Sequence, residues 1–287
     1  MELQEHTETD NPVAQLAQTV KAGVLGIDET WPSRFLIGLM QLRPDVKPVM
    51  GSLPVEQSTM YKDEEERQRM REASLINDEC MDMVIHAIRE GVTEKELALK
   101  VENFFKARGC NSLGFSIVGM GKNGADPHHD ADETVLKEGD SIVIDIGAPF
   151  NHYWCDMTRT VFYKSVSEKQ REVYETVRRA NEAAIAKIKP GVAFKEFDLA
   201  ARKVIEDAGY GEYFTHRTGH SIGMKEHEKP PVASDCEVIV RPGMVFSIEP
   251  GIYLPGQFGV RVEDLVLVTE DGCEVLNKYT KDLIVVE

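Results

Sequence analysis

Two aspartates lie inside apolar runs that are predicted to form neighbouring strands. Asp145 falls within residues 142–146 and Asp156 within residues 153–157, and residues 149–152 between them are typical of a turn. A hairpin centred between residues 150 and 151 would place the two aspartates directly opposite each other, with Cβ atoms about 5 Å apart. Like charges opposed in an apolar sheet are destabilising unless a proton or a cation lies between them. The pair therefore indicates a proton-sharing dyad or a metal site.

Two glutamates repeat this arrangement in the second half of the chain. Glu249 and Glu263 are equally far from Gly256, which lies at the centre of a predicted hairpin formed by residues 244–249 and 258–268. One carboxylate pair could share a proton, but two pairs brought face to face form a cage of four carboxylates. Such a cage requires cations, because like charges disfavour one another in a buried site. The four residues together predict a metal centre.

Histidines supply a further candidate ligand. Three of the eight, His216, His220 and His227, fall within residues 216–227, among glycines that allow close backbone approach. Four carboxylates and one imidazole form a hard, oxygen-rich ligand set that suits manganese, cobalt or iron better than a thiolate zinc site would. Two such ions a few ångströms apart would polarise a carbonyl and activate a water molecule.

The elements that position these residues occur twice. Residues 88–109 align with residues 188–209 at an offset of 100, with seven identities in 22 positions. Two unrelated amphipathic helices could share such residues, but each copy follows a long helical pattern and precedes a predicted hairpin. The long helices begin at Asp63 and Ser167, each with a capping-box pattern, and Thr93 caps the shorter helix of the first copy. The predicted order is helix, helix, hairpin, twice over.

Composition excludes several classes of function. The chain has 287 residues, a formal net charge of −16 and a pI near 5.0, so phosphates would be repelled over most of its surface. No uncharged stretch reaches the roughly 18 residues of a membrane-spanning helix, and the acidic start lacks the order of a signal peptide. The five cysteines are odd in number and show no CxxC spacing. We therefore expect a cytoplasmic protein with neither a nucleic-acid partner nor a membrane partner.

Five separate motifs complete the pattern, and they follow one another in the order of a known enzyme family. They are residues 123–129, 145–148 (DIGA), 156–160 (DMTRT), 216–231, and 249–251 (EPG) with 261–264 (RVED). From about residue 62 to the C-terminus the chain resembles the metallopeptidases of the pita-bread fold, which include methionine aminopeptidase, aminopeptidase P and prolidase. It is most similar to their Xaa-Pro branch.

This resemblance implies the fold and the domain organisation. It implies an α+β, duplicated pita-bread fold, in which two helix-helix-hairpin halves form a curved antiparallel sheet flanked by helices. Residues 61–287 would be the catalytic domain. Residues 1–60, with an acidic start and a prolyl segment at 47–54 before the first helix, resemble the end of a creatinase/prolidase-type N-terminal domain.

The resemblance also implies a role for each matching residue. The metal ligands would be Asp145, Asp156, His220, Glu249 and Glu263, holding two divalent ions per chain: manganese is expected, with cobalt, iron or zinc as alternatives. Asp156 and Glu263 would bridge both ions, and Glu249 would also act as general base. His227 would hydrogen-bond the developing oxyanion, and His128 would position the substrate and leaving group. Because His129 follows directly, the choice between these two rings rests on position alone.

The roles of His216 and Arg261 are each open to two interpretations. His216 and Arg261 would either hold ligands in place or contact an end of the substrate, where a guanidinium could fork onto a carboxylate.

The implied function is a dinuclear hydrolase that removes the N-terminal residue from Xaa-Pro peptides, as an aminopeptidase P or an Xaa-Pro dipeptidase, in a homodimer. A non-catalytic peptide-binding module and a non-peptidase amidohydrolase on the same fold are the alternatives. A GxGxxG pattern at residues 119–124 also suggests a dinucleotide fold. That fold requires a helix opening at the glycines, whereas residues 125–130 are turn-like.

Overall fold

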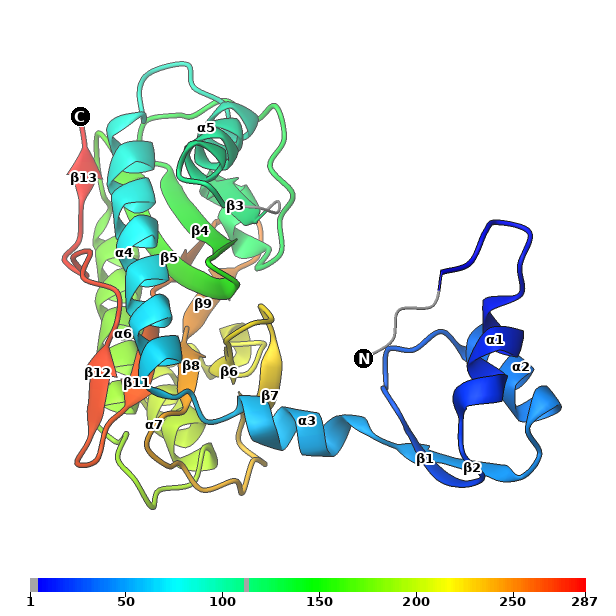
Figure 1. The fold of residues 1–287 in the computed structure, drawn as a ribbon. Coiled ribbons are helices and arrows are strands. Elements are labelled where there is room, and N and C mark those ends of the chain that lie inside the picture. The colour runs from blue at the N-terminus through cyan, green and yellow to red at the C-terminus, as the bar shows by residue number, and fades with distance from the viewer. Residues whose placement is uncertain (1–4, 111–113) are drawn as a thin grey trace. The chain divides into compact units, whose positions relative to one another are not determined.

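The computed structural model describes residues 5–110 and 114–287. The chain divides into two compact units, Met1–Ser58 and Thr59–Glu287 (Figure 1). Within the described residues no helix is long and apolar enough to cross a membrane.

The first unit contains a parallel strand pair. Its elements are α1 (Pro12–Thr19), β1 (Gly23–Ile27), α2 (Ser33–Leu42), β2 (Val46–Met50) and the start of α3 (Ser52–Thr59). β1 pairs with β2 in parallel, and α2 forms the connection between them. The prolyl segment at 47–54 precedes the first long helix of the repeat, and its residues complete β2 and begin α3. Asn11 starts α1 by accepting hydrogen bonds from Val13 N and Ala14 N.

The second unit repeats a helix pair and a set of strands. The helices are α4 (Glu64–His86), α5 (Glu94–Ala107), α6 (Glu168–Ile185) and α7 (Lys195–Asp207), with 3₁₀ turns η1 (Gly121–Ala125) and η2 (Gly211–Tyr213). The strands are β3 (Phe115–Met120), β4 (Ser141–Phe150), β5 (Tyr153–Tyr163), β6 (Gly219–Ser221), β7 (Glu228–Val232), β8 (Val245–Ile248), β9 (Gly251–Leu254), β10 (Phe258–Arg261), β11 (Asp264–Val268), β12 (Cys273–Val275) and β13 (Val285–Val286). The capping boxes predicted at Asp63, Thr93 and Ser167 are all present.

The strands form a four-stranded sheet in the order β13-β5-β4-β3, a five-stranded sheet in the order β12-β11-β8-β6-β7, and the pair β10-β9. Helices α4 and α5 pack against β3, β4 and β5 through one apolar core, and α6 and α7 pack against β8, β9 and β10 through another. Figure 1 shows α4 running alongside β5. The predicted α+β order of helix, helix and hairpin in each half is confirmed.

The predicted register of the first hairpin is wrong. Asp145 pairs with Thr158 and Gly147 with Asp156, so the two aspartates are offset by two residues on one face of the sheet instead of directly opposite. The reason is the turn, which contains only Asn151 and His152, with φ of 50° and 73°. Positive φ at both central residues is the signature of a two-residue type I′ hairpin. Pro149 and Phe150, expected in the turn, therefore belong to β4.

The predicted centre of the second hairpin is confirmed. β9 pairs with β10 so that Gly251 faces Arg261, and β8 pairs with β11 so that Ile248 faces Asp264. Both pairings are centred on Gly256, whose φ of +70° suits a glycine. The ladder is interrupted at the level of Glu249 and Glu263, which lie outside the strands.

A matched hydrogen bond marks the duplication. Asn77 of α4 is fully buried and donates through Nδ2 to the carbonyl of Ile146 on β4. Asn181 of α6 is also fully buried and donates to the carbonyl of Ile248 on β8. Each long helix is thus fixed to the strand that leads to a candidate ligand, because a buried amide without a partner would be costly.

Candidate metal centre

The second unit contains a cavity of about 630 Å³ lined by residues of both hairpins, a size typical of small-molecule sites. Every residue predicted for the site lines it: His128, Asp145, Asp156, His216, His220, His227, Glu249, Arg261 and Glu263. Six further lining residues were not predicted, namely Phe115, Ile117, Pro127, Asp130, Arg217 and Glu226.

The candidate ligands reach the cavity from separate strands. Asp145 lies on β4, Asp156 on β5 and His220 on β6, whereas Glu249 follows β8 and Glu263 lies between β10 and β11. Ligand atoms of Asp156, His220 and Glu263 all lie within 4.8 Å of one another. The bends after β8 and β10 thus bring the two halves of the duplication to one point.

Three buried carboxylate oxygens in the cavity have no hydrogen-bond partner among the described residues. They are Asp145 Oδ1, Asp156 Oδ1 and Glu263 Oε1. Their side chains are buried, with residue exposures of 8%, 3% and 1%. Because buried polar atoms are almost always paired in folded proteins, these oxygens fit a site that receives cations. The donor set of carboxylates and one imidazole suits hard divalent ions.

His220 is oriented as a metal ligand. Its Nδ1 lies 3.1 Å from the carbonyl oxygen of Ser221 and donates to it. Nε2 therefore presents its lone pair to the cavity, 3.6 Å from both Asp156 Oδ2 and Glu249 Oε1. Metal-binding histidines are usually fixed in this way by a hydrogen bond from the other ring nitrogen.

Burial and crowding raise the pKa of three of these carboxyl groups. For Glu249 the pKa rises to about 7, chiefly through burial, with Asp156 and Asp145 adding repulsion. The pKa values of Asp156 and Glu263 are raised well above their ordinary range, again chiefly by burial and then by the neighbouring carboxylates. In the metal-free chain these groups retain protons that a bound cation would displace.

We expect the metal-free chain to lose stability as the pH rises from 6.5 to 8. The folded chain binds protons on Asp156, Glu249 and Glu263 that the unfolded chain releases below pH 5. Each such carboxyl therefore lowers the free energy of unfolding by about 1.4 kcal/mol per pH unit until it ionises in the folded chain. His216 and His227, whose pKa values are lowered to about 4, act in the opposite direction but only below about pH 6.5. Urea unfolding of chelator-treated protein measures the slope, and a free energy of unfolding that rises between pH 6.5 and 8 would contradict it.

Arg261 is held entirely by protein groups. Its guanidinium donates to Asp145 Oδ2 at 2.6 Å, Thr158 Oγ1 at 3.1 Å, Tyr253 Oη at 2.8 Å and the carbonyl of Pro127 at 3.3 Å. The residue is only 2% exposed. This geometry favours the interpretation in which Arg261 orients a ligand over the one in which it contacts an end of the substrate.

His216 takes part in the same chain of hydrogen bonds. Its Nδ1 donates to the carbonyl of Arg217 at 2.7 Å, and its Nε2 lies 2.8 Å from Tyr253 Oη. Because Arg261 already donates to the tyrosine oxygen, the hydroxyl proton points to His216. Burial and the nearby Arg261 lower the His216 pKa to about 4, and burial raises the Tyr253 pKa to about 12. Both groups are therefore neutral near pH 7.

The remaining histidines differ in their exposure to the cavity. The His227 ring lies 4.1 Å from the His220 ring at 80°, and burial followed by His220 lowers its pKa to about 4. His128 is exposed and lines the cavity. Its neighbour His129 instead hydrogen-bonds Glu94 at 2.7 Å. The structure thus favours His128 as the ring that faces a substrate.

Comparison with known proteins identifies the family. Residues 68–270 match the model of metallopeptidase family M24. The chain belongs to this family. The M24 chain is 41% identical over 232 residues to the putative dipeptidase YkvY of Bacillus subtilis, an alignment that covers 80% of this chain and 64% of the relative. It is 40% identical over 230 residues to an uncharacterized peptidase of Staphylococcus aureus strain MSSA476, covering 80% of this chain and 66% of the relative. It thus spans slightly less than two thirds of these curated relatives.

Solved structures show the same fold. A prolidase from Thermococcus sibiricus matches with a TM-score of 0.95 and 34% identity, covering 99% of this M24 chain and 80% of that one. An Xaa-Pro dipeptidase from Bacillus anthracis matches with a TM-score of 0.92 and 35% identity, covering 97% of this chain and 80% of that one. An X-Pro aminopeptidase from Thermotoga maritima matches with a TM-score of 0.86 and 34% identity, covering 98% of this chain and 81% of that one. The predicted pita-bread fold and membership of the Xaa-Pro branch are confirmed.

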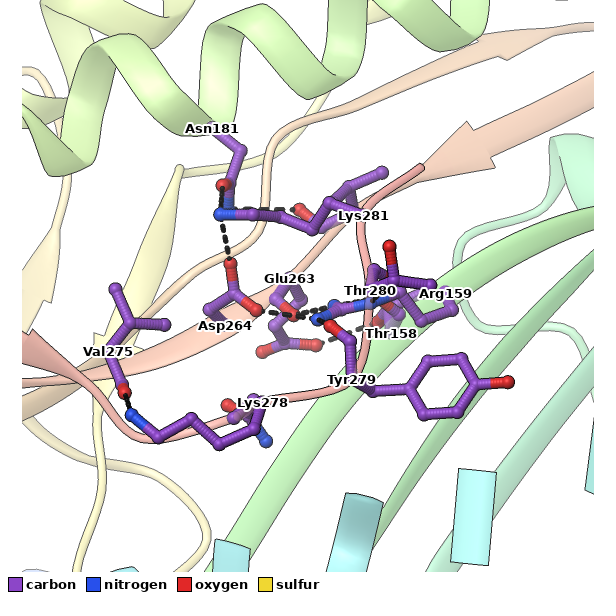
Figure 2. Close-up of polar contacts among 12 residues, drawn as sticks. Thr158, Arg159, Asn181, Glu263, Asp264, Val275, Lys278, Tyr279, Thr280 and Lys281 are labelled. Atoms are coloured by element: carbon purple, nitrogen blue, oxygen red, sulfur yellow. Dashed lines mark hydrogen bonds and ion pairs between the residues drawn. The ribbon is translucent and has the colours of Figure 1, made fainter. Parts of the chain in front are cut away.

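A buried polar network behind the M24 site holds the segment that contains Glu263. Figure 2 shows Arg159 at its centre, with Asp264 and Lys281 beside it. The Arg159 guanidinium, 2% exposed, donates to Asp264 Oδ1 and to the carbonyls of Thr158, Glu263, Tyr279 and Thr280. Lys281 donates to Asp264 Oδ2 at 2.8 Å and to Asn181 Oδ1 at 2.9 Å. The network joins the C-terminal segment to both halves of the duplication.

Replacing Arg159 with methionine is expected to lower the free energy of unfolding by about 3 kcal/mol, because it removes the hydrogen bonds that the guanidinium makes to four carbonyls and to Asp264 in a buried site. Arg178→Met is the matched control: that arginine forms half-exposed ion pairs with Glu175 and Glu182 on α6, and such pairs contribute under about 1 kcal/mol. Urea unfolding measures both variants. Equal losses would show that the Arg159 network does not stabilise the fold as described.

Proposed function

We propose that this chain is a dinuclear metal-dependent hydrolase that removes the N-terminal residue from Xaa-Pro peptides. The observation that supports it most is the convergence of Asp156, His220 and Glu263 in a cavity where three buried carboxylate oxygens have no partner among the described residues. Membership of metallopeptidase family M24 supports the same reaction class.

The five proposed ligands are Asp145, Asp156, His220, Glu249 and Glu263, and manganese is the ion we expect, with cobalt, iron or zinc as alternatives. Two divalent ions bound there would supply a water activated near neutral pH and polarisation of the scissile carbonyl. Arg261 holds Asp145 through Oδ2 and Thr158 holds Glu263 through Oε2 at 2.7 Å. In each case the other carboxylate oxygen is left for a cation.

Side chains of this chain supply the proton transfers. The Glu249 carboxylate lines the cavity, with Oε1 3.6 Å from His220 Nε2, and can take a proton from the attacking water and pass it on. The neutral His227 can donate an N–H to the oxyanion that develops on the carbonyl. The nitrogen of an Xaa-Pro bond has no hydrogen, so its expulsion requires a delivered proton. His128 faces the cavity and is proposed to position that leaving group.

Arg217 is the cation available to a substrate carboxylate. It is exposed, lines the cavity, and forms no hydrogen bond or ion pair through its guanidinium in the described parts of the chain. Arg261, the other arginine of the cavity, is fully engaged by protein acceptors. A guanidinium binds a carboxylate strongly and with defined geometry. We therefore propose that Arg217 contacts the C-terminal carboxylate of a short Xaa-Pro substrate.

Arg217→Gln is expected to raise the KM for an Xaa-Pro dipeptide about tenfold, since a hydrogen bond to a charged group contributes about 1.5 kcal/mol or more. The same dipeptide with an amidated C-terminus is the control, because it lacks the charge that Arg217 would bind. Its KM should be unchanged by the substitution. An equal change for both substrates would show that Arg217 does not bind the carboxylate.

The reaction itself is tested with a peptide panel. The manganese-loaded chain is incubated with an Xaa-Pro dipeptide, an Xaa-Pro-Yaa tripeptide and an Xaa-Ala-Yaa control, and products are identified by mass spectrometry. The proposal expects the N-terminal residue to be released from Xaa-Pro substrates only. The ratio of dipeptide to tripeptide turnover separates a dipeptidase from an aminopeptidase. If all Xaa-Pro peptides remain uncut, the proposed function is wrong.

We also propose a cytoplasmic homodimer, and we propose that residues 1–60 are the end of a creatinase/prolidase-type N-terminal domain. The parallel pair β1 and β2 in the first unit supports the latter. Light scattering coupled to gel filtration tests the dimer, and a monomer at micromolar concentration would contradict it.

A further inference from the structure

His129, the residue next to His128, forms a hydrogen bond with a buried carboxylate that does not line the cavity. Glu94, at the start of α5, is completely buried. Its two oxygens accept four hydrogen bonds, from Met120 N at 2.7 Å, Asn123 Nδ2 at 3.0 Å, His129 Nε2 at 2.7 Å and Asp132 N at 3.1 Å. A single side chain therefore binds residues spread over the whole segment 120–132.

The donor set shows that Glu94 organises this segment. No lysine or arginine donates to the carboxylate among its hydrogen bonds, and its charge is stabilised by N–H groups and by its place in the first turn of a helix. Glu94, His129 and Asp132 offer ligand atoms within 4.8 Å of one another. Both Glu94 oxygens are nevertheless occupied by donors, and Asp132 Oδ1 accepts from Thr134 N at 2.7 Å. A cation would have to displace these bonds, so the cluster is a structural anchor.

The segment is held from the cavity side as well. The carbonyl of Pro127 accepts from Arg261, which also holds Asp145. The backbone N–H of His128 donates to Asp126 Oδ1 at 3.0 Å. Residues 127 and 129 are thus fixed on opposite sides of His128, whose own side chain is exposed to the cavity. The ring of His128 forms no hydrogen bond within the described parts of the chain, so its placement depends on its neighbours.

We propose that Glu94 and His129 form a positioning pair that holds His128 over the proposed metal centre. This inference rests on the proposed function, because it assigns His128 to the reaction there. The pair acts on the backbone. The His129 ring donates a hydrogen bond to Glu94, and this bond fixes the position of the backbone on which the neighbouring His128 lies. Small misplacements of a reacting group are costly, since a shift of about 1 Å can reduce a rate by a factor of about 100.

A double-mutant cycle tests the pair. His129→Ala should lower kcat/KM on an Xaa-Pro dipeptide about ten- to a hundredfold, mainly through kcat, with unchanged metal content. His129→Gln, whose amide can still donate to Glu94, should recover most of that loss. In the His128→Ala background, His129→Ala should cost less than about threefold more, because the group it positions is already gone. His86→Ala, at an exposed histidine near the end of α4, is the matched control and should match the wild type.

Additive losses in the cycle, or a His129→Ala enzyme within twofold of the wild type, would overturn the proposal. A readout independent of turnover is hydrogen exchange of the backbone amides of residues 126–132 in the metal-free chain. Exchange should be at least tenfold faster in His129→Ala and close to wild type in His129→Gln and His86→Ala. Unchanged exchange in His129→Ala would also overturn it. If exchange responds but the wild type cuts no Xaa-Pro peptide, the pair orders the segment as inferred and the proposed function is what fails.

Discussion

Replacing Asp156 with asparagine should abolish binding of the two metal ions and lower turnover at least a thousandfold, while the fold is retained. Asp156 is one of the five proposed ligands, and an amide offers one neutral oxygen in place of two charged ones. The metal-free chain should tolerate the change. Because the pKa of Asp156 is raised well above its ordinary value by burial and by Asp145, the substitution replaces a protonated acid by another neutral group.

Two measurements check this expectation. Metal analysis after gel filtration should find ions retained by the wild type and lost from the Asp156→Asn variant. Thermal unfolding should show that manganese stabilises the wild type, by about 2.7 kcal/mol at a free ion concentration a hundred times Kd, and leaves the variant unchanged. Asp235→Asn, at an exposed loop position, is the matched control. Full activity in the Asp156→Asn enzyme would show that the ligand assignment is wrong.

Replacing His227 with alanine should lower kcat about 100- to 1000-fold and leave the metal content unchanged. His227 is neutral near pH 7 because its pKa is lowered to about 4, so it can offer an N–H where negative charge develops on the substrate, and losing such a donor costs rates of this size. Its side chain is 58% exposed and lies against the His220 ring without being a proposed ligand.

The contrast with Asp156→Asn separates catalysis from metal binding. His227→Gln supplies an amide N–H at a similar reach and should recover part of the lost kcat. Steady-state kinetics and metal analysis on the same samples give both quantities. A kcat within threefold of the wild type, or ions lost together with the imidazole, would contradict the proposed role of His227.

Local signals in the sequence were sufficient for most of the fold. The capping boxes at Asp63, Thr93 and Ser167 predicted three helix starts correctly, because a capping box depends on residues only three positions apart. The hairpin around Gly256 was also placed correctly. The first hairpin was not, because its register depends on whether Pro149 and Phe150 continue a strand. Only the type I′ turn at Asn151 and His152 settles that question, and those residues lack the usual glycine.

The residues of the cavity likewise divide into those that the sequence predicted and those that it did not. All the residues predicted for the site line one cavity. The four carboxylates follow the two hairpins, whereas the histidines lie outside them. Of the residues that orient these side chains, Arg261 was predicted, but others were missed. Thr158 contacts Glu263, Arg159 contacts Asp264, and Glu94 contacts His129 across separations of 105, 105 and 35 residues. Such contacts depend on tertiary packing and leave no periodic pattern in the sequence.

The central claim is that this cavity holds two divalent ions, and native mass spectrometry of the chain titrated with manganese tests it most directly. The account predicts that the metal-free species converts to a form with two ions per chain, and that the Asp156→Asn variant does not. A wild-type chain that binds no ion, or saturates at one, would contradict it.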